Sequence, residues 1–280
     1  MPGMLYLVPT PIGNLGDISP RCRKTLAEAD FIAAEDTRVT LKLLNYLEIK
    51  KPLVSYYEHN KKESGPRIIE RILAGETCAL VSDAGSPAIS DPGEDLVALC
   101  ASAGVTVSAI PGPCAAVSAL SISGLPTGRF CFEGFLSTNK KSRQEHLSGL
   151  KNETRTMIFY EAPHKLTRTL ADLSAAFGTD RRISLCRELT KLHEQIVRTT
   201  LGKACAIYDE TPPRGEFVLI VEGAQETAQT AVTLADAVAL ALDEIARGVS
   251  KKDAVRRIAS ETGLAKNVLY DAVLKSSCES

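Results

Sequence analysis

The chain has no long apolar stretch. None of its apolar runs approaches the roughly 18 residues that a membrane-spanning helix needs. The apolar run near the N-terminus, from Met4 to Val8, is short, has no basic segment before it and is followed by Pro9. A signal peptide is excluded by this pattern, and we expect a first β-strand there. The sequence therefore predicts a cytoplasmic protein that has no membrane partner.

Closely spaced metal-binding residues are also missing. The eight cysteines never lie closer together than Cys100 and Cys114, which excludes CxxC zinc pairs and a thioredoxin motif. The four histidines are equally scattered. We expect the cysteines to be small buried residues in a reducing compartment, and we expect no metal.

Several common catalytic motifs are absent as well. There is no GxxxxGK[ST] motif, and the first loop reads Pro9-Thr-Pro-Ile-Gly-Asn14 where a dinucleotide-binding protein would carry GxGxxG. Neither GxSxG nor HExxH occurs. These absences argue against kinases, NTPases, dehydrogenases, serine hydrolases and zinc proteases.

What is present is a globular composition with uneven charge. The residues are 44% hydrophobic and 24% charged, which is typical of a globular protein. The length of 280 residues corresponds to about two domains. The net charge is −1, yet residues 129–203 carry +6 and residues 245–280 carry +3, against −3 for 1–128 and −7 for 204–244. The two basic blocks are suited to a polyanion, although a solvated surface explains them equally well.

The hydrophobic pattern predicts two α/β domains and a helical tail. Residues 1–124 alternate short β-branched runs with helical segments, which is typical of a parallel sheet flanked by helices. Residues 125–224 contain strands whose connection from Leu189 to Glu194 is too short for a crossover helix, so we expect a mixed sheet. Residues 225–280 begin with a small polar linker, and their pattern predicts three helices after it. We expect this helical tail to be an RNA-binding or an accessory unit.

Glycine- and proline-rich loops follow several of the predicted strands. The most unusual runs from Ser82 to Gly93 (SDAGSPAISDPG), and a second runs from Ile110 to Ala116. Small residues let a ligand approach the backbone, and exposed N–H groups can hold its anionic part. Tyr160 and Glu161 follow a strand of the second domain, where an aromatic ring can stack on a base or pack in the core.

These loops resemble those of the tetrapyrrole methylase family, the class III S-adenosylmethionine methyltransferases. Ala84-Gly-Ser-Pro87 occupies the place of a glycine-glycine-aspartate-proline motif, and Pro111-Gly-Pro113 the place of a second loop. The resemblance covers residues 4–223. The runs LVPTPIGNLGDIS, AAEDTR, YYEHN and SDAGSPAISDPG are similar to a branch of this family that modifies RNA, and Ser86 in place of the aspartate suits that branch.

The resemblance implies S-adenosylmethionine-dependent 2′-O-methylation of a cytidine in the decoding region of small-subunit ribosomal RNA, by a homodimer. It also implies a cofactor in the cleft between the two α/β domains. The expected cofactor-binding residues are Pro11, Asp83, Ala84, Gly85, Pro87, Ile89, Pro113, Ala115, Tyr160, Glu161, Gly215 and Val218.

A ribose hydroxyl needs a base that removes its proton during methyl transfer. The expected catalytic group is Glu35, Asp36, Arg38 and His59. Glu35 and Asp36 are adjacent in a strand, so only one of them faces the cleft, while Asp36 or Thr37 can instead cap a helix. The sequence leaves the choice of base open.

Basic and polar side chains that could contact RNA lie in two loops. We expect Asn60, Lys140, Lys141 and Arg143 to bind RNA, against the alternative of ordinary surface charge. Two other functions remain as alternatives: methylation of a tetrapyrrole or another small substrate in the same fold, and a non-enzymatic regulator that binds nucleic acid through residues 250–275.

Overall fold

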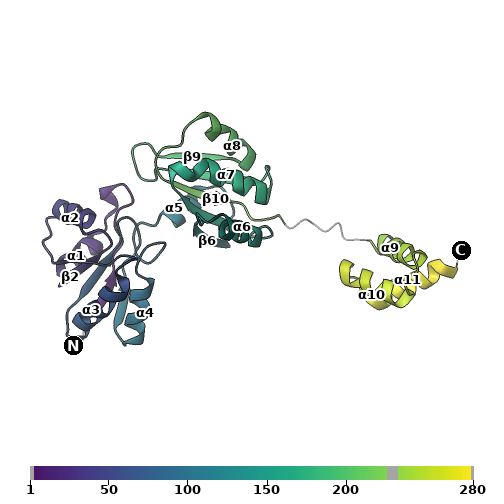
Figure 1. Ribbon diagram of the computed structural model, residues 1–280, viewed down its shortest axis with the longest axis horizontal. Coiled ribbons are helices and arrows are strands. Elements are labelled where there is room, and N and C mark those ends of the chain that lie inside the picture. Colours follow the sequence, from purple (N-terminus) through teal and green to yellow (C-terminus); the bar gives the residue numbers. More distant parts are fainter. Residues whose placement is uncertain (1–2, 226–232, 279–280) are drawn as a thin grey trace. The chain divides into compact units, whose positions relative to one another are not determined.

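The computed structural model describes residues 3–225 and 233–278 (Figure 1). Residues Met1–Gly223 form one compact unit and Ala224–Ser280 form a second, and each is described here by itself. The linker predicted after Gly223 lies mostly outside the described residues. The described helices include none that is long and apolar enough to cross a membrane.

The first sheet of the larger unit is parallel throughout. Its strand order is β3-β2-β4-β1-β5. The strands are β1 (Met4–Leu7), β2 (Phe31–Ala34), β3 (Leu53–Ser55), β4 (Cys78–Val81) and β5 (Thr106–Ala109). Every residue of β2 and β4 is buried, as expected for central strands covered on both faces. The parallel sheet predicted for residues 1–124 is confirmed, with its first strand at the predicted position.

Helices cover both faces of this sheet. Leu26 and Leu44 contribute to the core on one face, and Ile68 and Leu96 contribute to the core on the other. The helices that supply these residues, with one short 3-10 turn, are η1 (Leu15–Asp17), α1 (Pro20–Glu28), α2 (Thr37–Tyr46), α3 (Lys61–Leu73) and α4 (Glu94–Ser102). Ligand-binding loops of such sheets lie beyond the carboxyl ends of the strands.

The second sheet is mixed, as predicted. Its strand order is β6-β7-β10-β8-β9, with β6 parallel to β7 and the other pairs antiparallel. The strands are β6 (Phe130–Phe135), β7 (Thr156–Glu161), β8 (Arg182–Arg187), β9 (Gln195–Thr200) and β10 (Phe217–Val221). On one face this sheet packs against α6 (Lys140–Gly149), α7 (Pro163–Phe177) and α8 (Leu201–Glu210), where Leu147, Leu170 and Leu201 join Met157 in the core.

Helix α5 (Ala115–Ile122) connects the two halves of the larger unit. It follows β5 of the first sheet, yet Ala116, Ala119 and Leu120 pack against Ile158 and Ile220 of the second sheet (Figure 1). The first half thus supplies the helix that covers one face of the second sheet. The expected pair of α/β sheets is confirmed, whereas the expected domain boundary at residue 124 stays a prediction.

The smaller unit consists of three described helices, as predicted: α9 (Leu234–Ala246), α10 (Lys251–Thr262) and α11 (Lys266–Cys278). Thr233 caps α9, and Gly263, with a φ of 72°, ends α10 in the left-handed conformation that glycine adopts easily. Ala241, Val255 and Leu269 meet in a small core.

Candidate active site

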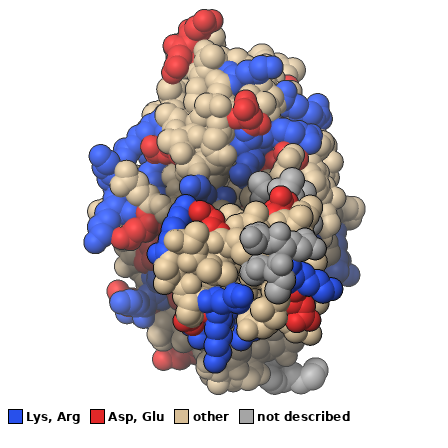
Figure 2. All heavy atoms as spheres, turned by 90° about the vertical axis from the view of Figure 1, so that its right-hand side faces the viewer, with Lys and Arg blue, Asp and Glu red and all other residues tan. Residues whose placement is uncertain are grey.

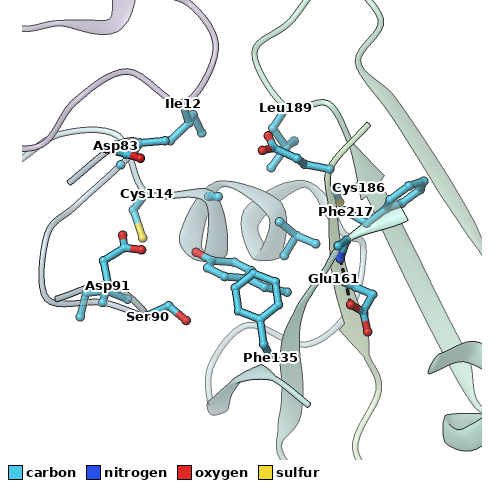
Figure 3. A pocket seen from close by; sticks show the side chains of 18 of the residues that line it. Ile12, Asp83, Ser90, Asp91, Cys114, Phe135, Glu161, Cys186, Leu189 and Phe217 are labelled. Atoms are coloured by element: carbon cyan, nitrogen blue, oxygen red, sulfur yellow. Dashed lines mark hydrogen bonds between the residues drawn. The ribbon is translucent and has the colours of Figure 1, made fainter. Parts of the chain in front are cut away.

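A cleft of about 550 Å³ lies between loops of the first sheet and strands of the second (Figure 3). Its volume is in the range of small-molecule sites. The loops after β2, β4 and β5 line one side, and β6, β7, β8 and β10 supply the other. Nine residues predicted from the sequence line it together: Glu35, Asp83, Ala84, Gly85, Ile89, Ala115, Tyr160, Glu161 and Val218.

The loop after β4 is held against the loop after β1. The backbone N–H of Thr10 donates to Gly85 O at 2.9 Å, and Gly85 N–H donates back to Thr10 O at 3.0 Å. Gly85 has a φ of +84°, and a Cβ there would lie 3.3 Å from Ile12 Cγ2. Glycine is therefore required both by the backbone conformation and by the close approach of the two loops.

Three carboxyl groups gather on one side of the cleft, namely Glu35, Asp83 and Asp91. Burial is the main cause that raises the pKa of each of them. The negative charges of Asp91 and Asp83 raise the pKa of Glu35 further, and Asp36 does the same to Asp83. A positively charged ligand is favoured at this site, because it relieves the repulsion among the three carboxylates.

Asp36 has a different role from its neighbour Glu35. It caps α2, because its carboxylate accepts from Arg38 N–H at 2.8 Å, and it pairs with the Arg38 guanidinium at 3.0 and 2.6 Å. These hydrogen bonds lower the pKa of Asp36 to about 2. Neither Asp36 nor Arg38 lines the cleft. The expectation that one of the two adjacent carboxylates faces the cleft is met by Glu35, and helix capping accounts for Asp36.

The loop after β3 lies apart from the cleft lining. His59 is exposed and has an edge-to-face contact with Tyr57, with ring centroids 6.1 Å apart. The Asn60 side chain donates to Ser55 O at 3.0 Å and accepts from Tyr57 N–H at 2.8 Å. These two hydrogen bonds hold its amide in the turn, and the expectation that Asn60 binds RNA stays a prediction.

Four of the expected cofactor residues do not line the cleft. Pro11 lies beside Ile12, and Pro87 lines a separate cavity of about 370 Å³ behind the loop. The Pro113 carbonyl accepts from Ser86 Oγ at 3.0 Å, which joins the two glycine-rich loops. Gly215 leaves room for the Glu188 side chain, since a Cβ there would lie 2.5 Å from Glu188 Cγ. These residues shape the loops around the cleft rather than its surface.

The basic cluster of residues 140–143 divides into two parts. Lys140 and Lys141 are exposed at the start of α6, which Asn139 caps. Arg143 is only 4% exposed: its Nε donates to Asp172 at 2.6 Å and its Nη2 donates to Thr169 Oγ1 at 2.7 Å. The prediction that Arg143 contacts RNA is wrong, because a partner 29 residues away takes up the charge.

Glu161 and Tyr160 are fixed by hydrogen bonds. Glu161 is buried and accepts from the Thr169 hydroxyl and from Ala162 N–H. Tyr160 Oη accepts from Ala116 N–H at 3.1 Å, and burial raises the pKa of this phenol to about 12. Tyr160 therefore stays neutral, and it anchors the second sheet to the start of α5.

Sequence reasoning did not select several residues of the cleft. Asp91 was seen only as part of a loop, and Phe135 only as the end of a strand. Both lie in the lining: Asp91 lies on the first-sheet side of the cleft in Figure 3, across from Phe217, and Phe135 comes from β6 of the second sheet. Gly134, directly before Phe135, was the available signal, because glycine inside a strand often marks a bulge. Within residues 3–225 and 233–278, no three His, Cys, Asp or Glu side chains are placed so that they could hold a metal ion together.

Comparison with known proteins identifies the family. The family model "Tetrapyrrole (Corrin/Porphyrin) Methylases" matches residues 4–205. The chain belongs to the tetrapyrrole methylase family. Within it, the chain is 46% identical over 273 residues to ribosomal RNA small subunit methyltransferase I of Synechocystis sp., which covers 98% of both chains. It is 47% identical to the protein of the same name from Halalkalibacterium halodurans, over 96% of this chain and 94% of that protein.

Solved structures of methylases share the fold of the larger unit. Uroporphyrin-III C-methyl transferase from Thermus thermophilus, complexed with S-adenyl homocysteine, has a TM-score of 0.55 and 18% sequence identity, and covers 79% of this chain and 97% of that one. At this identity the likeness is one of fold.

The opposite pKa shifts of Glu35 and Asp36 predict opposite effects on stability. Glu35 has a raised pKa in the fold, so it binds its proton more tightly than the unfolded chain does, and folding is favoured at low pH. We expect Glu35→Gln to raise the melting temperature at pH 8. The gain should shrink as the pH falls through the raised pKa of Glu35 and should be gone below the pKa of an ordinary glutamate.

Asp36→Ala is the matched control for that experiment. The pKa of Asp36 is lowered to about 2, so its contribution is present above the ordinary aspartate pKa and is lost as the pH falls toward 2. The variant should melt lower than the wild type at neutral pH and converge with it in acid. Thermal melts of both variants from pH 2 to 8 check this, and parallel curves would contradict the assignment.

The burial of Arg143 predicts a loss of stability on its removal. Arg143→Ala removes the guanidinium that donates to the 37% exposed Asp172 and to the buried Thr169 hydroxyl, and we expect this to cost roughly 1 to 3 kcal/mol. Urea unfolding measures the loss. A free energy of unfolding within about 0.5 kcal/mol of the wild type would return Arg143 to the status of a surface residue.

Proposed function

We propose that this protein is an S-adenosylmethionine-dependent methyltransferase of small-subunit ribosomal RNA, acting on the ribose 2′-hydroxyl of a cytidine in the decoding region. The proposal rests on one observation above all: Glu35, whose pKa is raised, faces a cleft lined by the open backbone of two glycine-rich loops. The full-length relatives named as ribosomal RNA small subunit methyltransferase I support the substrate class.

The cleft fits S-adenosylmethionine. The ligand carries a sulfonium and an ammonium group, and Glu35, Asp83 and Asp91 offer carboxylates on one side. Apolar side chains of Ile12, Leu189 and Val218 suit the adenosine part. When bound, S-adenosylmethionine supplies an electrophilic methyl group.

Glu35 is the proposed base. Of the four residues expected to act in catalysis, only Glu35 lines the cleft. Its raised pKa makes it a stronger proton acceptor than an ordinary glutamate, whereas Asp36 is a weak one because Arg38 stabilises its charged form. Glu35 would hold the ribose proton at a carboxylate oxygen while the loops keep the reactants aligned, which contributes more than any single proton transfer.

Exposed basic side chains support an RNA substrate. On the face shown in Figure 2, Lys and Arg side chains are spread among neutral and acidic ones. Lys140 and Lys141 lie at the start of α6, where the helix N-terminus also favours phosphate. The exposed start of α11, with Lys266, Asn267 and Tyr270, offers a second surface in the smaller unit. We propose that the protein works in the cytoplasm as a homodimer, as the resemblance implies.

The proposed function is tested by nuclease digestion and mass spectrometry of ribosomal RNA. Ribosomal RNA from cells that lack the protein should miss one 2′-O-methylcytidine of the small subunit. The purified protein with S-adenosylmethionine should restore it. A methyl group restored on a base atom would contradict the proposal. So would methylation of a tetrapyrrole by the protein, if ribosomal RNA from cells that lack the protein keeps all of its methyl groups.

Removal of the proposed base should affect the rate and leave binding intact. We expect Glu35→Gln to lower the single-turnover methylation rate by roughly 10² to 10⁴, and Asp36→Ala to keep it within a few-fold. The wild-type rate should fall as the pH drops through the raised Glu35 pKa, because the protonated carboxyl cannot accept the ribose proton. If the methylation rate of Glu35→Gln falls at low pH in the same way as the wild-type rate, Glu35 is not the base.

Phosphate contacts at α6 predict a change in salt dependence. The double variant Lys140→Ala, Lys141→Ala should weaken RNA binding and reduce the slope of log K against log salt by about 1 to 2, with unchanged melting temperature. Lys24→Ala, Lys42→Ala, on the surface of α1 and α2, is the matched control. Equal slopes in the wild type and the α6 variant would leave these lysines as ordinary surface charge.

A further inference from the structure

Phe135 is an exposed aromatic residue inside the cleft. Its exposed fraction is 57%, although it lines the same cavity as Glu35 and Tyr160. It ends β6, the edge strand of the second sheet. Phe130, at the other end of the same strand, is 43% exposed and does not line the cleft.

A β-bulge turns Phe135 toward the cleft. In the pairing of β6 with β7, Phe132 lies opposite Ile158 and Phe135 lies opposite Tyr160, with a register shift between Phe132 and Gly134. Ile158 and Tyr160 belong to the sheet face that α5 and the cleft occupy. Regular alternation would put Phe135 on the other face from Phe132, so the extra residue changes which face receives the ring.

The bulge lies close to the loop after β4. Gly134 has a φ of +62°, and a Cβ at this position would lie 3.4 Å from Ser90 Oγ. Ser90 itself has a φ of 69°, which is rarely adopted by a non-glycine residue. The strained loop after β4 and the bulge in β6 therefore meet where Phe135 is presented, which is typical of a strained functional site.

The ring of Phe135 has an open surface. It meets Tyr160 edge to face, with centroids 5.6 Å apart and planes at 66°, and Tyr160 meets Phe132 in the same way at 5.0 Å and 73°. These contacts hold the aromatic cluster in place. Because the exposed fraction is above one half, a flat partner can still stack on Phe135.

The chain beyond Phe135 carries cations. Leu136 is buried in the core and fixes the strand end, and α6 starts at Lys140 with its N-terminus capped by Asn139. A flat apolar surface followed by two exposed lysines at a helix N-terminus matches a nucleotide, whose base stacks and whose phosphates are anionic. The backbone loops that suit the methyl donor lie on the first-sheet side of the cleft, and Phe135 lies on the other.

We infer that Phe135 is the platform on which the nucleobase of the target nucleotide stacks when its ribose enters the cleft. This inference rests on the proposed function and adds the residue that recognises the base. Sequence-specific recognition of RNA commonly uses unstacked bases that stack on aromatic side chains.

The test compares Phe135→Ala and Phe135→Trp with Phe130→Ala as the matched control. The probes are small subunits that lack the methyl group, and an RNA oligonucleotide with the mapped target nucleotide, either intact or abasic at that position. We expect Phe135→Ala to raise the KM for the intact oligonucleotide roughly ten- to a hundredfold. Phe135→Trp should restore it, and Phe130→Ala should match the wild type.

The abasic oligonucleotide isolates the stacking contact. The wild type should lose affinity for it, and Phe135→Ala should bind it no worse than the wild type does, because the contact is already missing. An equal loss by Phe135→Ala on both oligonucleotides would overturn the inference. So would a comparable loss of S-adenosylmethionine affinity in calorimetry, which would place Phe135 in the donor site.

The outcome also separates this inference from the function it rests on. A wild-type protein that methylates neither probe would refute the proposed function and the stacking role together. Normal methylation by the wild type, with an unchanged KM in Phe135→Ala, would refute the stacking role alone.

Discussion

The packing of α5 against the second sheet determines the geometry of the candidate site. This helix begins directly after the glycine-rich loop that follows β5, and its apolar face lies on Ile158 and Ile220 of the second sheet. The hydrogen bond from Ala116 N–H to Tyr160 Oη fixes its first turn. Burial of this apolar surface thus brings the loops of one sheet opposite the strands of the other. The cleft exists because these two halves share a core.

The charges in the cleft follow from that geometry. Glu35 and Asp83 come from neighbouring strands, and burial raises the pKa of both. Asp83 also joins the two strand ends, because its carboxylate accepts from Asp36 N–H at 3.0 Å. A cluster of carboxylates in a partly buried site destabilises the empty protein, and a cationic ligand offsets that cost. Functional sites commonly show such a conflict between stability and activity.

The sequence predicted the strands and the glycine-rich loops well, because both have short-range signals. Buried strands such as β4 are runs of apolar residues, and Gly85 must be glycine for local reasons. The different environments of Glu35 and Asp36 could not be predicted from the sequence, since both are carboxylates and only Asp36 pairs with Arg38. Neither the composition nor the spacing of residues in the sequence predicts that the pKa of Glu35 is raised and that of Asp36 is lowered.

The errors arose from long-range contacts. Arg143 was assigned to RNA from a local cluster of charge, and its partner Asp172 lies on another helix. Regular period-two alternation would place Phe135 on the opposite face of the sheet, and the bulge at Gly134 turns it toward the cleft. For Arg143 the deciding interaction joins residues that are distant in the sequence. For Phe135 it is an irregularity in the pairing of β6 with β7.

The central claim is that one cleft between the two sheets holds the methyl donor beside Glu35. A crystal structure of the protein with S-adenosylhomocysteine tests it most directly. We expect the ligand against the backbone of Asp83–Ser86 and beside Ala115 and Val218, with its sulfur on the Glu35 side. A ligand found in the cavity behind Pro87, or bound in the cleft with its sulfur facing away from Glu35, would contradict the account.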